Sequence, residues 1–249
     1  MFRSVLHAIL TLIFLTFLTG AVFAGEWRVM PIRLDLGKEA RTGAITVVND
    51  GKMPINYQIR AYEWTQDATG KDNYSETADL IVFPKIMTIN TREEKVIRIG
   101  LGPGQARNEK TYRVFIEELP PPRKDQETGV SVAIKFGVPV FVKPLAEEIQ
   151  GTFETPAFGN GAVNFAIKNS GTVNFNITKV LVKGKDVGGN TVLARETAGW
   201  YLLSGSARTY SLPVSQEECA RLYSLELEAI NDKKPLKTVV SIDKARCKP

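Results

Sequence analysis

The sequence predicts an all-β protein made of two immunoglobulin-like β-sandwich domains in tandem. Three observations predict this fold: apolar and polar residues alternate over short runs, turn residues separate these runs about every 8–12 residues, and both halves of the 249-residue chain show the pattern. The composition agrees, because 43% of the residues are apolar and 24% are charged, as in a folded globular protein. A chain of this length can form two domains of ordinary size, each with its own core.

The first 24 residues predict a secretory signal peptide. Arg3 gives a positive start, residues 9–18 are almost entirely apolar, and small residues suit cleavage after Ala24. The alternative is an uncleaved membrane anchor, since residues 5–24 could nearly span a bilayer. The short apolar core favours cleavage, so we expect an exported mature protein that is not inserted in a membrane.

Seven strands are predicted in each half. In the first half they cover residues 27–36, 43–49, 55–64, 80–89, 95–101, 111–118 and 130–142. In the second half they cover residues 151–155, 162–168, 173–183, 199–203, 207–213, 222–230 and 236–243. Because Lys143-Pro144 ends the last strand of the first half, we expect one domain over residues 25–145 and another over 146–249.

Both halves carry an Asn-x-Gly turn directly after a predicted strand. The turns are Asn49-Asp50-Gly51 and Asn169-Ser170-Gly171. Asn and Gly tolerate positive φ, which favours tight antiparallel connections. The repeated turn supports two similar domains.

The predicted strand 130–142 differs from the others in length and pattern. Its even positions are all apolar, whereas its odd positions change from small or polar to uncharged after Lys135. At about 3.3 Å per residue it would span roughly 43 Å, more than a small sandwich can cover. We therefore expect a core strand in its second half, with Pro139 at an edge or a bulge. Its first half packs against a neighbouring loop, completes the local sheet, or pairs with a gap or edge in another protein.

The charge and the histidine count exclude several functions. The net charge of +5 falls to about +4 without the signal and is scattered, which does not predict nucleic-acid binding. The only histidine is His7, inside the predicted signal, so a Ser-His-Asp or Cys-His mechanism is excluded. A paired-carboxylate hydrolase is not excluded, but no spacing of acidic residues singles out a pair. We expect a protein that is not an enzyme and has no cofactor and no metal.

The two cysteines of the chain, Cys219 and Cys247, lie close together near the C-terminus. In an oxidising exported compartment we expect them to form a disulfide, which would contribute roughly 3–4 kcal/mol. Two cysteines without a histidine do not make a zinc site.

The first half resembles the periplasmic pilus-assembly chaperones of the PapD-like family. The resemblance rests on YRVFIEELPPP at 112–122, a polar loop, and VSVAIKFGVPVFVKP at 130–144, with supporting pieces at Pro31-Ile32-Arg33 and Phe83-Pro84. It implies a boomerang-shaped periplasmic chaperone, active in fimbrium biogenesis and cell wall organization, that binds pilin-type subunits and delivers them to an outer-membrane usher. The chaperone lends its strand 130–142 to a subunit that lacks a strand, and self-association of the free protein is left open.

The resemblance also assigns residues to the binding site. The alternating donor residues correspond to Val130, Val132, Ile134 and Phe136, and the cleft arginine that binds the C-terminal carboxylate of the subunit corresponds to Arg33. The second anchoring base of the family is a lysine, and Pro139 occupies its position here. Lys135, Arg98 and Arg113 are the candidates to replace it, and the change indicates an alternative or archaic-type branch of the family. A secreted immunoglobulin-like adhesin or structural pilus component remains the alternative function.

Overall fold

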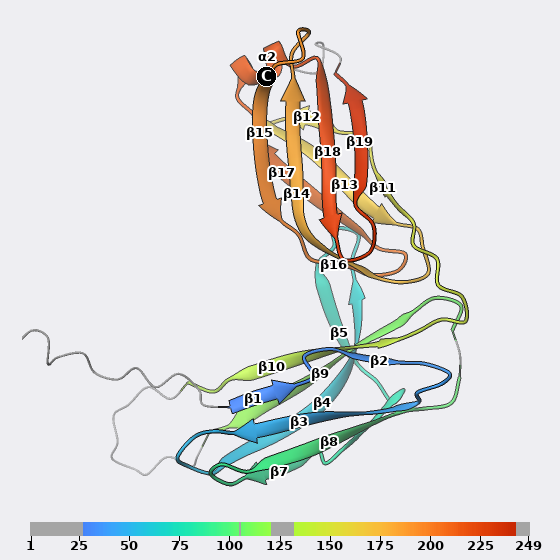
Figure 1. The fold of residues 1–249 in the computed structure, drawn as a ribbon, viewed down its shortest axis with the longest axis vertical. Coiled ribbons are helices and arrows are strands. Elements are labelled where there is room, and N and C mark those ends of the chain that lie inside the picture. The colour runs from blue at the N-terminus through green and yellow to red at the C-terminus, as the bar shows by residue number, and fades with distance from the viewer. Residues whose placement is uncertain (1–26, 105, 121–131, 243–249) are drawn as a thin grey trace, which may run out of the picture.

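The computed structural model describes residues 27–104, 106–120 and 132–242, which form two β-sandwiches joined end to end (Figure 1). Nearly all regular structure is β, as predicted, and the described residues include one short helix, α2 (Gln216–Arg221). In that part of the chain, no helix has the length and apolarity that a membrane crossing needs.

The first sandwich consists of two sheets that enclose one apolar core. One sheet has the order β1-β3-β8-β6 and the other β2-β10-β9-β4-β5, with β7 paired to β4. The strands are β1 (Trp27–Met30), β2 (Leu34–Leu36), β3 (Thr42–Asn49), β4 (Ile55–Gln66), β5 (Asp72–Glu76), β6 (Leu80–Phe83), β7 (Ile86–Ile89), β8 (Glu94–Leu101), β9 (Lys110–Leu119) and β10 (Lys135–Val142). Alternate residues of both sheets, such as Ile45, Ile97 and Val114, are fully buried between them.

The second sandwich repeats this plan. One sheet has the order β11-β13-β12 with β17 on β13, and the other β15-β14-β18-β19 with β16 on β14. The strands are β11 (Gly151–Phe153), β12 (Ala157–Gly159), β13 (Ala162–Asn169), β14 (Phe175–Lys185), β15 (Thr191–Ala198), β16 (Tyr201–Leu202), β17 (Ala207–Pro213), β18 (Ser224–Asn231) and β19 (Leu236–Ser241).

Several predicted strands have different limits in the structure. The predicted strand 27–36 divides into β1 and β2, and 80–89 into β6 and β7, and in each case the two parts join different sheets. Both breaks contain a proline, which has no N–H for a ladder. Strands β5 and β15 were not predicted, because their residues are largely exposed and carry no apolar alternation. Helix α2 was also missed, although Ser215 and Glu218 form a capping box.

The two Asn-x-Gly turns were predicted as tight antiparallel connections, and this interpretation was wrong. Asn49 ends β3, and the chain then crosses to β4 in the other sheet. The buried Asn49 amide donates to Met53 O at 2.8 Å and Ile89 O at 3.1 Å, and its Oδ1 accepts from Gly51 N. Asn169 makes the equivalent bonds to Val173 O, Leu202 O and Gly171 N. Each asparagine therefore closes a corner between two sheets by satisfying backbone groups there.

Candidate functional site

Strand β10 has different neighbours along its two edges. On one side it pairs antiparallel with β9 over its whole length, whereas on the other side β2 pairs only with Val140–Val142. Residues 135–139 therefore have one edge to which no described strand is paired. Pro139 lies in this stretch, as its missing N–H requires.

The second half of β10 is buried on both faces, as the sequence predicted. Val138 and Val140 lie fully buried in the core of the first sandwich, and Phe141, on the opposite face, is also fully buried. Phe136 is only partly buried and packs edge-on against Trp27, with ring centroids 6.2 Å apart.

Burial decreases before β10 begins. The predicted strand started at residue 130, but in the structure regular pairing starts at Lys135. Ile134 is held by Glu118, whose N–H donates to Ile134 O at 3.0 Å and whose Oε2 accepts from Ile134 N at 3.2 Å. Val132 is 78% exposed, and Val130 lies outside the described residues. The apolar pattern thus continues beyond the surface that the sandwich itself covers.

The outward face of the sheet that contains β10 is directed at the second sandwich, where an apolar cluster joins the two. Its members are Trp64, Phe141, Leu203 and Tyr201. Gln66 next to this cluster donates to Tyr201 O at 2.8 Å and accepts from Leu203 N at 3.0 Å. The junction is therefore both packed and hydrogen-bonded.

The hairpin formed by β4 and β5 extends onto the second sandwich (Figure 1). Gly70 O at its tip accepts from Arg208 Nη1 at 2.8 Å, and Asp72 Oδ2 accepts from Trp200 Nε1 at 2.9 Å. These contacts hold the tip of the hairpin against the second sandwich.

Glu109 links the sandwiches at the start of β9. Its Oε1 accepts from Asn174 N at 3.0 Å and from Asn174 Nδ2 at 2.7 Å, and its N–H donates to Thr172 O at 2.8 Å. Burial raises the pKa of the Glu109 carboxyl, although the Asn174 bonds oppose the shift.

Arg33 lies at the junction, just before β2. Its guanidinium donates to Asp35 at 2.9 and 3.1 Å, lies 4.4 Å from the Phe141 ring centroid and approaches Asp232 to 3.8 Å. Burial lowers the pKa of Arg33, but the hydrogen bond and charge of Asp35 outweigh it, so the pKa is raised. Arg33 is thus held charged, and Asp35 already accepts from its Nε and Nη2.

Arg113 on β9 lies directly opposite Pro139 of β10. Its guanidinium carbon is 4.1 Å from the Trp64 ring centroid and 6.0 Å from that of Trp200. Nη1 reaches Gly137 O at 3.5 Å, the limit for a hydrogen bond. Nε and Nη2 are buried and have no hydrogen-bond partner among the residues that the structure describes. Arg113 is therefore a cation beside the junction of the two sandwiches with unused donors.

The other two candidates for the second anchoring base are placed less favourably. Lys135 lies on the face of Arg113 but binds Glu117 Oε2 at 3.4 Å and covers the Phe115 ring. Arg98 is exposed on β8, opposite Phe83 of β6, and so belongs to the other sheet. Because β8 lies in the sheet that does not contain β10, this position disfavours Arg98 as the second anchoring base.

The sequence of the first sandwich matches the model of a known family. Residues 27–147 match the model of the pili and flagellar-assembly chaperones, PapD N-terminal domain. The chain carries a PapD-type chaperone domain.

Solved structures extend this PapD-like likeness to both sandwiches. A chain of the CsuC–CsuE chaperone–tip adhesion subunit pre-assembly complex from archaic chaperone–usher Csu pili of Acinetobacter baumannii is 19% identical, with a TM-score of 0.58 over 86% of this chain and 97% of that one. A chain of the Salmonella enterica SafA pilin–SafB chaperone complex is 18% identical, with a TM-score of 0.57 over 88% and 99%. The Class 5 fimbriae chaperone CfaA is 16% identical, with a TM-score of 0.56 over 86% and 98%. No curated protein sequence matches the chain significantly. These likenesses establish a PapD-like two-domain fold.

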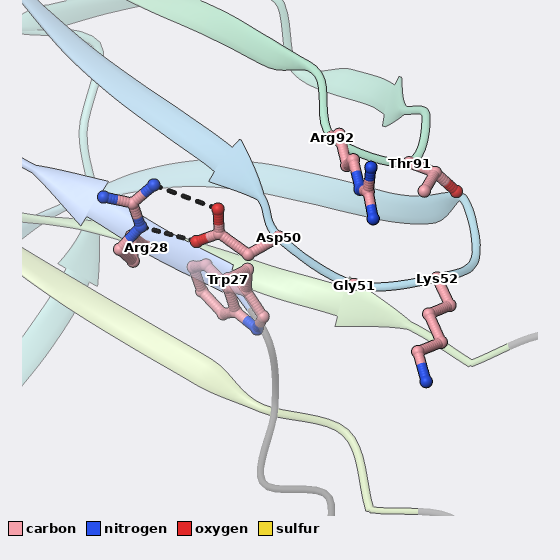
Figure 2. Close-up of a pocket in the computed structure, with 7 residues that line it drawn as sticks. All are labelled: Trp27, Arg28, Asp50, Gly51, Lys52, Thr91 and Arg92. Atoms are coloured by element: carbon pink, nitrogen blue, oxygen red, sulfur yellow. Dashed lines mark hydrogen bonds and ion pairs between the residues drawn. The ribbon is translucent and has the colours of Figure 1, made fainter.

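A hollow at the opposite end of the PapD-like domain is lined by three cations, Arg28, Lys52 and Arg92, and by one carboxylate, Asp50 (Figure 2). Arg28 and Asp50 form two hydrogen bonds there, one of them 3.0 Å long. Arg92 nearby, at φ 60°, belongs to the turn between β7 and β8. The hollow is thus a feature of the end of the sandwich, away from the cleft.

The predicted disulfide has one end in the described structure. Cys219 is buried in α2 of the second sandwich, packed in its core. Cys247 lies outside the described residues, as does the predicted signal peptide, so the pairing and the cleavage stay predictions.

The sequence alone left Arg113 as one of three candidates for the second anchoring base and did not indicate that Trp64 and Trp200 lie beside it. The register that sets Arg113 against Pro139 is a non-local property, so no sequence motif marks it.

Proposed function

We propose that this PapD-like protein is a pilus-assembly chaperone that binds a pilin-type subunit by lending it the segment from Val130 to Phe136. The observation that carries the proposal is the 78% exposure of Val132 in an apolar alternation that leads into an edge of β10 without a described strand partner. Natural sheets seldom leave such an edge uncovered unless another chain pairs with it.

The likeness to chaperones solved in complex with a pilin or a tip adhesion subunit supports this proposal. The protein would be exported to the periplasm by its signal peptide, would act there without catalysis, and would deliver the subunit to an outer-membrane usher. A structural pilus component is less favoured, because Trp27–Met30 is already paired with β3 as the first strand of a sandwich.

We further propose that Arg113 replaces the lysine that the family carries at the position of Pro139. Facing strands bring their opposite residues close together, so a base at Arg113 can serve the same part of the cleft. A guanidinium with free Nε and Nη2 donors can bind a carboxylate with two parallel hydrogen bonds. Arg33 would be the second base of this anchor.

The proposal is tested with the double variant V132D/I134D. Burying an apolar side chain contributes about 1.5–3 kcal/mol, so losing two should weaken subunit binding by at least about 100-fold. The measurement is co-purification of the chaperone with a pilin encoded in the same gene neighbourhood, followed by titration of the purified pair.

The matched control is Ala133→Asp, which places one negative charge between the two donor positions, on the opposite side of the segment. This variant should bind the subunit nearly as well as the wild type. Equal binding by V132D/I134D and wild type, with both proteins folded, would exclude strand donation.

A further inference from the structure

The donors of Arg113 are covered in this structure. Nε and Nη2 expose almost no surface, so a carboxylate cannot reach them unless a neighbouring side chain moves. An arginine anchor that is closed in the free protein therefore requires a movable cover.

Trp64 is not suited to move. It is 1% exposed and packs against Phe141 and Tyr201, with ring centroids 6.1 and 5.4 Å away, in the cluster that joins the two sandwiches. Displacing the Trp64 ring would disrupt this cluster.

Trp200 is suited to move. It is 39% exposed and lies between β15 and β16, outside regular structure. Its backbone O accepts from Ile177 N at 3.0 Å, which holds the main chain, while its indole N–H donates to Asp72 at 2.9 Å. The side chain can therefore rotate away at the cost of an exposed hydrogen bond, a loose cation–π contact and one edge contact with the Tyr201 ring, 5.8 Å away, while Tyr201 keeps its contacts with Trp64 and Phe141.

We infer that the Trp200 indole is a movable cover over Arg113, held closed by Asp72 and displaced by the C-terminal carboxylate of the bound subunit. The inference rests on the proposed function of Arg113. Asp72 also accepts from Gln66 Nε2 at 3.0 Å, and Gln66 keeps its bonds to the second sandwich when the indole leaves. Opening the cover thus leaves the junction intact. Trp200 is a positioning residue, since it limits access to the anchor and makes no bond to the carboxylate.

The experiment uses the mature chain and two probes, the peptide N-acetyl-Val-Thr-Val-Thr-Val-Thr as its free acid and as its C-terminal amide. The indole N–H signal of Trp200 in a ¹⁵N-resolved spectrum is the one that disappears in Trp200→Phe. We expect the free acid to shift this signal and the amide to leave it in place.

Removing the cover should strengthen binding of the acid alone. Apparent affinity is reduced by the fraction of protein that is open, so Trp200→Ala should bind the free acid about 10-fold more tightly and the amide equally well. Trp200→Phe keeps a ring but loses the bond to Asp72. Its affinity for the free acid should lie between those of the wild type and Trp200→Ala. Tyr223→Ala, a matched removal of an exposed aromatic ring elsewhere in the second sandwich, should change neither affinity.

The outcomes separate the cover from the anchor. If wild type prefers the acid but Trp200→Ala gains nothing, or loses affinity for both peptides, the cover is excluded while the anchor stands. If wild type and Trp200→Ala both bind acid and amide equally, Arg113 is not an anchor and the cover fails with it. Strand donation is tested separately by V132D/I134D.

Discussion

Residues 132–136 and residues 138–141 continue one apolar alternation, yet they lie in opposite surroundings. Val138, Val140 and Phe141 are fully buried, because the core covers one face of β10 and the second sandwich covers the other. Val132 is 78% exposed and Phe136 is only half covered, by Trp27. The difference shows that the same pattern can build a core at one end and remain available to a partner at the other. Substitutions in residues 138–141 should therefore lower the stability of the protein, whereas substitutions in residues 132–136 should mainly weaken subunit binding.

The sharpest test of this separation compares Phe141→Ala with Val132→Ala. Truncating the buried Phe141 should lower the free energy of unfolding by about 3–5 kcal/mol, because it leaves a cavity in the junction cluster. Truncating Val132 should change it by less than about 0.5 kcal/mol, since the side chain is exposed. Denaturant unfolding of both variants measures the two values. Similar losses of unfolding free energy in both variants would contradict the division into an exposed part and a buried part.

A smaller effect is expected at the boundary between the two parts. Glu118→Ala removes the carboxylate that accepts from Ile134 N and should cost about 1 kcal/mol or less. Faster amide hydrogen exchange at Ile134, with unchanged exchange at Val138, would confirm that the donor segment opens independently. Glu117→Ala, on the neighbouring residue, is the control. Equal acceleration at both amides would mean that β10 opens as a unit.

The smallest effect concerns the junction that buries the second part. Because the pKa of Glu109 is raised by burial, the folded state holds its proton more tightly than the unfolded state does. Ionisation of Glu109 therefore lowers stability progressively as the pH rises above its ordinary value of 4.5. Glu109→Gln keeps an oxygen that can accept from Asn174 but cannot ionise. The variant should therefore not lose stability as the pH rises.

The stability of Glu109→Gln relative to wild type should accordingly increase between pH 4 and pH 7, measured by denaturant unfolding at each pH. Glu147→Gln is a comparison on an exposed carboxylate, which should give a smaller pH dependence. If the difference in unfolding free energy between Glu109→Gln and wild type does not change between pH 4 and pH 7, the ionisation of Glu109 does not affect the junction.

Much of the first sandwich could be predicted from the sequence, since its core strands have clear alternation. Strands β3, β8 and β9 start and end within one residue of their predicted limits. The exposed strands β5 and β15 lack this alternation, because neither face needs a continuous apolar row. The apolar alternation that leads into β10 was predictable for the same local reason as the core strands, whereas the sheet that carries Arg98 could not be known.

The sequence by itself determined the two sandwiches, the apolar row that begins at Val130, and the asparagines that each precede a glycine by two residues. These are local properties, because side chains alternate every two residues along a strand. Only the tertiary structure decided that Asn49 and Asn169 close corners between sheets, that Pro139 faces Arg113, and that Trp200 from the second sandwich lies near that arginine. Register and packing depend on residues far apart in the chain, and no spacing within one segment can encode them.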